Sequence, residues 1–139
     1  MLEEAQQTIE HIRAGLATKA ASVNLENRKV LLAELEEKSN APGLWDDPAA
    51  AQDLMRKIAA ARDFIAPYEE LETKTSDVLE LLELAKAEED ADLAKEIESE
   101  VREIQEQYST LGRALLLSGE YDANNANFAV NAGAGGTEA

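Results

Sequence analysis

The sequence predicts a mainly α-helical protein, an antiparallel helical bundle built around a long helical hairpin. Of 139 residues, 45% are hydrophobic but only 4% are aromatic. This composition favours helices rich in leucine and alanine over sheets, which need β-branched and aromatic residues. Apolar residues also recur every three or four positions through most of the chain, as on one face of a helix. The length suits one ordinary domain with a modest core.

Two helices are predicted at the start of the chain. The second helix is short and begins after Asn24, its expected N-cap. Its inward residues are Leu25, Leu32 and Leu35. It ends in KSNAPG, where Pro42 and Gly43 favour a turn. The first helix places one apolar face inward, made of Leu2, Ala5, Ile9, Ile12, Leu16, Ala20 and Val23.

The strongest start signal is LWDDP, in which Asp47 is the expected N-cap and Pro48 the first helical residue. Leu44 and Trp45 should fold back onto the first turns as an apolar lid. Pro67 lies inside the pattern that follows and costs about 3 kcal/mol in a helix interior. Because the apolar phase continues past it, we predict one long helix kinked near Asp63 to Pro67, with two separate helices as the alternative. The apolar face comprises Leu54, Ile58, Ala61, Ile65, Tyr68, Leu71, Thr75, Val78, Leu82 and Ala85.

The acidic stretch from Ala87 to Asp92 predicts a turn that caps one more helix, paired antiparallel with its predecessor. LSGEYDANN, residues 117–125, should end that helix, and NFAVNA, residues 127–132, alternates as in a short strand. The apolar face of the last helix comprises Leu93, Ile97, Val101, Ile104, Tyr108, Leu111 and Leu115.

Charge argues against several classes of partner. The formal net charge is -16, from 29 acidic and 13 basic residues. Such a chain should be repelled by phosphate backbones, so we expect no direct nucleic-acid binding and a preference for basic protein partners. There is no cysteine, no secretory signal and no uncharged apolar run near the roughly 20 residues that span a bilayer. We therefore expect a soluble cytoplasmic protein with no membrane partner.

Candidate chemistry is absent from the sequence. The terminal NAGAGGTEA lacks the lysine of a phosphate-binding loop after Gly136 and the third glycine of a dinucleotide fingerprint after Gly135. A sharp strand-to-helix turn, with Thr137 as the cap of a following helix, explains it better. His11 is the only histidine, which excludes a two-histidine metal site, and it should lie on the surface. We predict no catalytic residue, no cofactor and no metal.

Two stretches nevertheless resemble a known family. Residues 115–139, LLLSGEYDANNANFAVNAGAGGTEA, and residues 44–55, LWDDPAAAQDLM, are similar to the bacterial class I peptide chain release factors. The SGEYDANNA lead-in favours the branch that recognises UGA and UAA stop codons. In that family a helical domain precedes an α/β body. The resemblance therefore implies an N-terminal helical domain over 1–116, and over 117–139 a linker plus the first strand and turn of a truncated second domain.

The resemblance also implies a role in translation termination at the ribosome. The family's serine-proline-phenylalanine and glycine-glycine-glutamine motifs do not occur in this sequence, so no catalytic role carries over. The implied partners are ribosomal proteins near the GTPase-associated region and the class II release-factor GTPase. The alternative is a free-standing acidic helical interaction or adaptor protein.

Overall fold

A computed structural model describes residues 2–118, and these residues are almost entirely helical. The helices are α1 (Leu2–Ser22), α2 (Leu25–Lys38), α3 (Pro48–Glu88) and α4 (Ala91–Ser118), with one turn of 3₁₀ helix, η1 (Leu44–Asp46), before α3. The predicted mainly α class is confirmed. The predicted strand at 127–132 and the turn after it lie outside the described residues. So does the predicted second domain, 117–139, except for Leu117 and Ser118, which still belong to α4.

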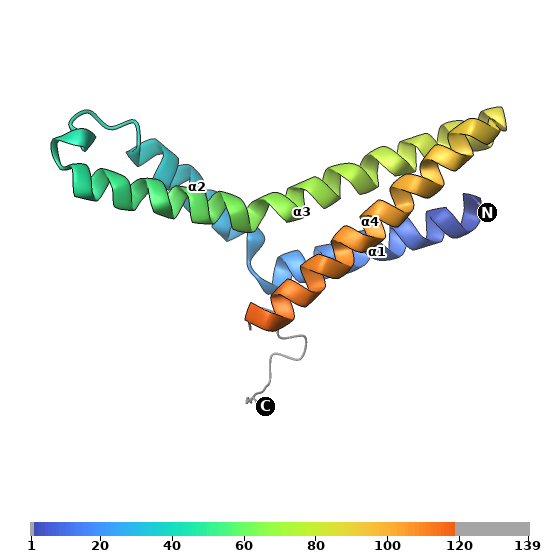
Figure 1. Cartoon of the computed structure of the whole chain (residues 1–139), viewed down its shortest axis with the longest axis horizontal. Helices are drawn as coiled ribbons and strands as arrows, with labels where there is room; N and C mark the ends of the chain where they lie inside the picture. Colours follow the sequence, from blue (N-terminus) through green and yellow to red (C-terminus); the bar gives the residue numbers. More distant parts are fainter. Residues whose placement is uncertain (1, 119–139) are drawn as a thin grey trace.

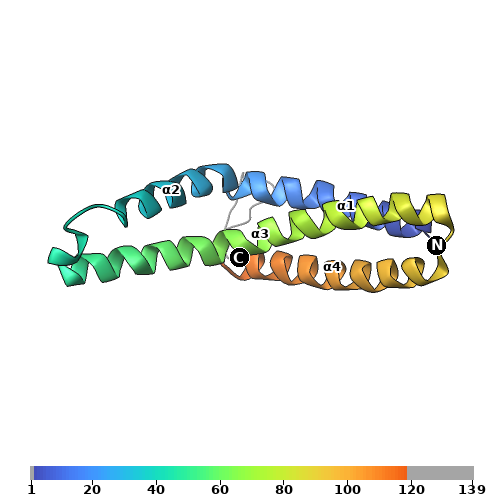
Figure 2. The ribbon, with the colours of Figure 1, turned by 90° about the horizontal axis from the view of Figure 1, so that it is seen from above.

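The helices form a body and a projecting arm. The body contains α1, α4 and the second half of α3, with α3 and α4 forming the predicted antiparallel hairpin (Figure 1). The arm, residues 25–66, contains α2, η1 and the first half of α3, and Figure 2 shows it continuing well beyond the body. Three helices can enclose a core between them, whereas two helices can cover only one face of each other.

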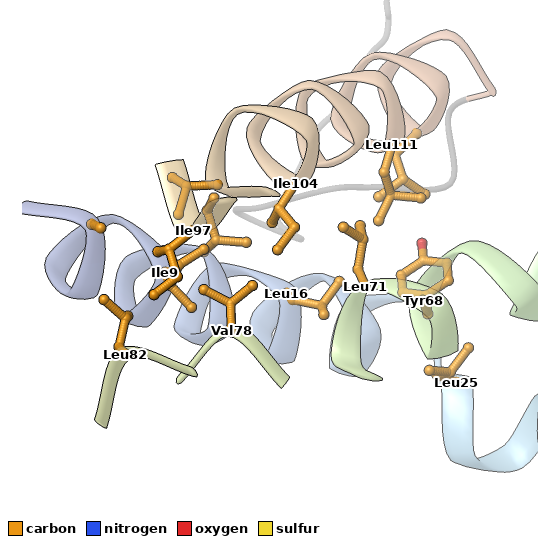
Figure 3. Packing of buried hydrophobic residues seen from close by; sticks show 14 of the residues in the cluster. Ile9, Leu16, Leu25, Tyr68, Leu71, Val78, Leu82, Ile97, Ile104 and Leu111 are labelled. Carbon is orange, nitrogen blue, oxygen red and sulfur yellow. The ribbon is translucent and has the colours of Figure 1, made fainter. Parts of the chain in front are cut away.

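The core of the body lies where α1, α3 and α4 meet. Figure 3 shows Ile104 of α4, Val78 of α3 and Ile9 of α1 directed into this space. Thr75 is the one polar residue that is fully buried among those described, and its hydroxyl donates to the Glu72 carbonyl at 3.0 Å. The predicted apolar faces are confirmed by the main buried cluster, which includes Ile9, Ile12, Leu16, Ile65, Tyr68, Leu71, Val78, Leu82, Ile97, Val101, Ile104, Leu111 and Leu115.

Two predicted helix starts are confirmed in detail. The Asp47 carboxylate accepts a hydrogen bond from the Ala50 amide at 3.3 Å, and Pro48 is the first residue of α3. At the acidic turn, the Asp90 carboxylate accepts from the amides of Asp92 and Leu93 at 3.0 and 3.2 Å. Each carboxylate thereby satisfies amides that have no partner within the first turn of its helix.

The prediction that Asn24 caps α2 is wrong in its chemistry. Asn24 precedes α2 but adopts the left-handed conformation, with φ 55° and ψ 50°, and its side chain makes no capping bond. A capping side chain reaches the first amides from an extended backbone, and a left-handed residue instead ends the preceding helix. The Asn24 amide accordingly donates to the Ala21 carbonyl of α1 at 3.1 Å.

The predicted apolar lid is also only partly right. Leu44 is half-buried, but Trp45 is 60% exposed. Leu32 and Leu35 of α2 are likewise half-buried instead of facing a closed core. The reason is common to all these residues: the arm has two helices, so no third layer covers them.

Pro67 lies inside a single helix, as predicted, and the alternative of two separate helices is wrong. Helix α3 runs for 41 residues without a break, and Pro67 is inside it. Its ribbon changes direction in the green middle section, near this proline (Figure 1). The kink has a direct cause, because proline cannot donate to the Asp63 carbonyl and its ring crowds that carbonyl.

Candidate docking surfaces

Metal-ligating side chains are not clustered in the part of the chain that the structure describes. Within 2–118, no three His, Asp or Glu side chains lie close enough together to hold a metal ion. His11 is exposed on α1, as the sequence predicted. Acidic side chains are abundant but lie spread along helix surfaces. The candidate sites are therefore surfaces that meet another macromolecule.

Charged contacts join α2 to α3 within the arm and, through Glu69, to the half of α3 that belongs to the body. Arg62 of α3 donates through Nε to the Glu36 carboxylate of α2 at 2.9 Å. The Lys29 ammonium of α2 lies 3.6 Å from the Glu69 carboxylate of α3. These pairs are partly or largely exposed to solvent, so each contributes little to stability.

Large apolar side chains are exposed on the arm. Seven large hydrophobic side chains are exposed among the described residues, and four of them belong to the arm: Val30, Leu31, Trp45 and Met55. Single exposed apolar residues are ordinary on protein surfaces. Trp45 is more informative, because tryptophan often supplies a large share of binding energy in protein interfaces and here it stands at the tip.

Charge divides the molecule along the same boundary. The arm, residues 25–66, has eight acidic and six basic residues and is nearly balanced. Residues 67–118, the second half of α3 with α4, have fifteen acidic against five basic residues. The acidic character predicted for the whole chain is therefore concentrated on the α3–α4 hairpin, and the arm can approach a partner of either sign.

The acidic hairpin partly neutralises itself. The Lys74 ammonium of α3 donates to the Glu103 carboxylate of α4 at 3.0 Å and lies 3.9 Å from Glu70. The surplus of acidic side chains on this hairpin still exceeds what its few cations can pair. A surface of this sign disfavours contact with nucleic-acid phosphates and suits basic protein surfaces.

A groove runs beside the kink of α3. Its volume is about 490 Å³, and it is lined by Asp63, Ala66, Pro67, Glu70 and Leu71 of α3 and by Glu106, Gln107, Thr110, Leu111 and Ala114 of α4. It contains no histidine and no basic side chain, and its charged groups are the carboxylates of Asp63, Glu70 and Glu106. Its lining is mostly apolar with an acidic rim.

The sequence predicted no site residue, and within 2–118 the structure brings together no catalytic constellation. What sequence reasoning missed is the arm as a separate surface. A count of charges by segment was the available signal, since residues 25–66 differ in balance from 67–118. The exposure of Trp45 had no sequence signal, because burial depends on what packs nearby. Among the described helices, none has the length and apolar character required to cross a membrane.

The fold and its surfaces define an acidic helical domain with a nearly neutral arm. Residues 28–139 match the PCRF domain family, and the chain belongs to that family. The chain is also similar to proteins named Peptide chain release factor 2. It is 38% identical to that of Roseobacter denitrificans over 138 residues, covering 99% of this chain and 37% of the relative.

Two further relatives bear the same name. The protein of Staphylococcus haemolyticus is 36% identical over 137 residues, covering 99% of this chain and 37% of the relative. That of Chloroflexus aggregans is 32% identical over 139 residues, covering 100% of this chain and 38% of the relative. The chain thus spans a little over a third of the length of these relatives. The family predicted from SGEYDANNA, NAGAGGTEA and LWDDP is confirmed.

Proposed function

We propose that this chain is the helical domain of a bacterial class I release factor that directs translation termination at UGA and UAA stop codons. The observation that carries the proposal is the identity of 32 to 38% with proteins named Peptide chain release factor 2 over 99 to 100% of this chain. An unrelated adaptor protein would not match one named factor over its whole length.

In this role the chain binds and does not catalyse. Its sequence contains neither the serine-proline-phenylalanine motif nor the glycine-glycine-glutamine motif that the family uses to read stop codons and to hydrolyse peptidyl-tRNA. We place both tasks in the part of the longer protein that this chain does not include. We also propose the division at residues 116 and 117 between the helical domain and the start of the next, and a cytoplasmic location.

The proposed partners are ribosomal proteins near the GTPase-associated region and the class II release-factor GTPase. The division of charge supports separate tasks for the two parts of the molecule. The nearly neutral arm, with Trp45 at its tip, suits a specific protein contact, because interface centres are poor in charge and rich in aromatic side chains. The acidic hairpin keeps the domain away from ribosomal RNA and favours basic ribosomal proteins.

The first expected result concerns activity. On ribosomes programmed with UGA or UAA and loaded with peptidyl-tRNA, this chain alone should release no peptide above the rate without factor, because it lacks both motifs. The measurement is release of labelled peptide over time, with a complete release factor as positive control. Robust stop-codon-dependent release by this chain would show that the chemistry resides within these 139 residues.

The second expected result concerns the arm. Trp45→Ala should weaken binding of the fluorescently labelled chain to ribosomes by about tenfold, the effect of losing an interfacial tryptophan worth roughly 1.4 kcal/mol. Leu84→Ala is the matched control, since Leu84 is also exposed, at 49%, but lies on the acidic hairpin. It should leave the affinity unchanged. Equal losses from both variants, or none from Trp45→Ala, would remove the arm tip from the proposed contact.

A further inference from the structure

The chain crosses between the body and the arm at two places within the described residues, once between two helices and once inside a helix that contains a proline. One crossing is the junction of α1 and α2, where α1 ends at Ser22 and α2 begins at Leu25. The other is the middle of α3, at Pro67. The arm is therefore joined to the body by a two-residue turn on one side and by a continuous helix bent at a proline on the other.

At Pro67 the helix has lost one of the bonds that keep it straight. Proline has no amide hydrogen, so the Asp63 carbonyl has no donor at the usual position four residues later. Helices bend most readily where such a bond is missing. Pro67 and Asp63 both line the groove of about 490 Å³ between α3 and α4.

At the α1–α2 junction the backbone turns through a single left-handed residue. Asn24 has φ 55°, and the amides of Val23 and Asn24 donate to the carbonyls of Lys19 and Ala21, as expected at the end of a helix. Helix α2 then starts with no side-chain cap. Two residues between helices allow the direction of α2 to change without breaking either helix.

Packed contacts cross the joint: Leu25 and Ile65 of the arm are 6% and 2% exposed and belong to one buried cluster with Tyr68 and Leu71 of the body. The Arg28 guanidinium of α2 lies 3.9 Å from the centre of the Phe64 ring on α3, and the Phe64 and Tyr68 rings stack at 5.8 Å. Arg28 also donates through Nε to the Val23 carbonyl at 2.8 Å, beside the junction. The guanidinium over the ring links Arg28 of α2 to Phe64 of α3, so these two segments of the arm can turn together.

We propose that the arm, residues 25–66, pivots as a unit on the three-helix body about a double hinge formed by Asn24 and Pro67. The tip of the arm then moves along an arc, while the packing within the arm and within the body stays the same. From Gln52 to Pro67 the lever is 15 residues, about 22 Å long at about 1.5 Å per residue, so a rotation of about 10° moves Gln52 by about 4 Å. The pivot is a property of the helices and does not depend on what the arm binds.

Pulsed electron–electron double resonance, which measures the distance between two spin labels, tests the pivot. The sequence has no native cysteine, so labels can be attached at introduced cysteines alone. The pair that spans the hinge is Gln52→Cys with Arg102→Cys, and the control pair within the body is Asp77→Cys with Arg102→Cys. All three positions are exposed. The distance distribution of the spanning pair should be about twofold broader than that of the control pair, because rotation about the hinge moves Gln52 relative to Arg102.

The decisive variant is Pro67→Ala, which restores a donor to the Asp63 carbonyl. It should narrow the distribution of the spanning pair to the width of the control pair and shift its mean by a few ångströms, roughly the displacement of a straightened lever. Pro48→Ala is the matched control, because Pro48 is the first residue of α3, where no hydrogen bond can be regained. It should change neither width nor mean.

Three outcomes would overturn the pivot. The first is equal widths for the spanning and control pairs in the wild-type chain. The second is an unchanged distribution in Pro67→Ala. The third is that Pro48→Ala narrows the distance distribution of the spanning pair as much as Pro67→Ala does, which would mean that removing any proline from α3 stiffens it.

Asn24→Gly tests the other crossing. Glycine keeps the left-handed conformation with fewer restraints, so this variant should broaden the distance distribution of the spanning pair further.

Discussion

Replacing Ile104 with alanine is expected to lower the free energy of unfolding by about 2 to 5 kcal/mol. Ile104 is only 1% exposed and lies on α4 where that helix meets α1 and α3 (Figure 3). The loss combines the transfer free energy of the deleted methyl and methylene groups with the cavity they leave. Leu82→Ala, at a residue of α3 that is also 1% exposed, should cost a similar amount. Denaturant unfolding followed by circular dichroism measures both.

Leu84→Ala is the control for this prediction. Leu84 lies two residues from Leu82 on the same helix but is 49% exposed, so its truncation should change stability by no more than about 0.5 kcal/mol. A near-neutral Ile104→Ala would mean that this apolar face is not buried between the three helices in solution. It would then face water or another chain.

Gly15→Ala should destabilise the protein by about 1 to 3 kcal/mol, although alanine is the better helix former. A Cβ atom built at Gly15 on α1 would lie 2.0 Å from the hydroxyl oxygen and 3.0 Å from Cζ of Tyr108 on α4. Tyr108 is held in place because Lys19 donates to its hydroxyl at 3.0 Å, with the ammonium 4.6 Å from the ring centre. Relieving the clash requires moving the ring and breaking these contacts. Thermal and denaturant unfolding measure the loss.

Gly112 is a matched control, at which alanine should raise the stability of the protein. A Cβ at Gly112 on α4 would lie 3.6 Å from the nearest atom, Cε of Lys19, which is ordinary contact. Gly112→Ala should therefore stabilise the protein by roughly 0.5 to 1 kcal/mol, the helix preference of alanine over glycine. In a Tyr108→Phe background the cost of Gly15→Ala should shrink, because the nearest clashing atom is gone. If Gly15→Ala stabilises as much as Gly112→Ala, α1 and α4 do not approach closely at this point.

Local chemistry explains which parts of the fold could be predicted. The cap at Asp47 and Pro48 depends on neighbours within one turn, and the apolar face of α3 depends only on spacing along the chain, so both were visible in the sequence. The same spacing on both sides of Pro67 was enough to predict one kinked helix. The family was visible as well, because SGEYDANNA and NAGAGGTEA are long and specific.

The missed features all depend on contacts between segments far apart in the chain. Leu35 and Trp45 have the apolar character of core residues, but the arm has only two helices and leaves them partly or largely uncovered. Asn24 is a common capping residue, yet the turn between α1 and α2 requires the left-handed conformation, from which it does not cap. Gly15 is explained only by Tyr108, a residue 93 positions later.

By itself the sequence determined the helices, their inward faces, the total charge and the family, because each of these follows from neighbouring residues or from their sum. Only the tertiary structure decided that half of α3 leaves the bundle and forms an arm with α2, so that a charge difference between two segments becomes a difference between two surfaces. The physical reason is that an apolar face is buried only where another helix packs against it. A sequence shows which faces are apolar, but only the packed chain shows which of them acquire a partner.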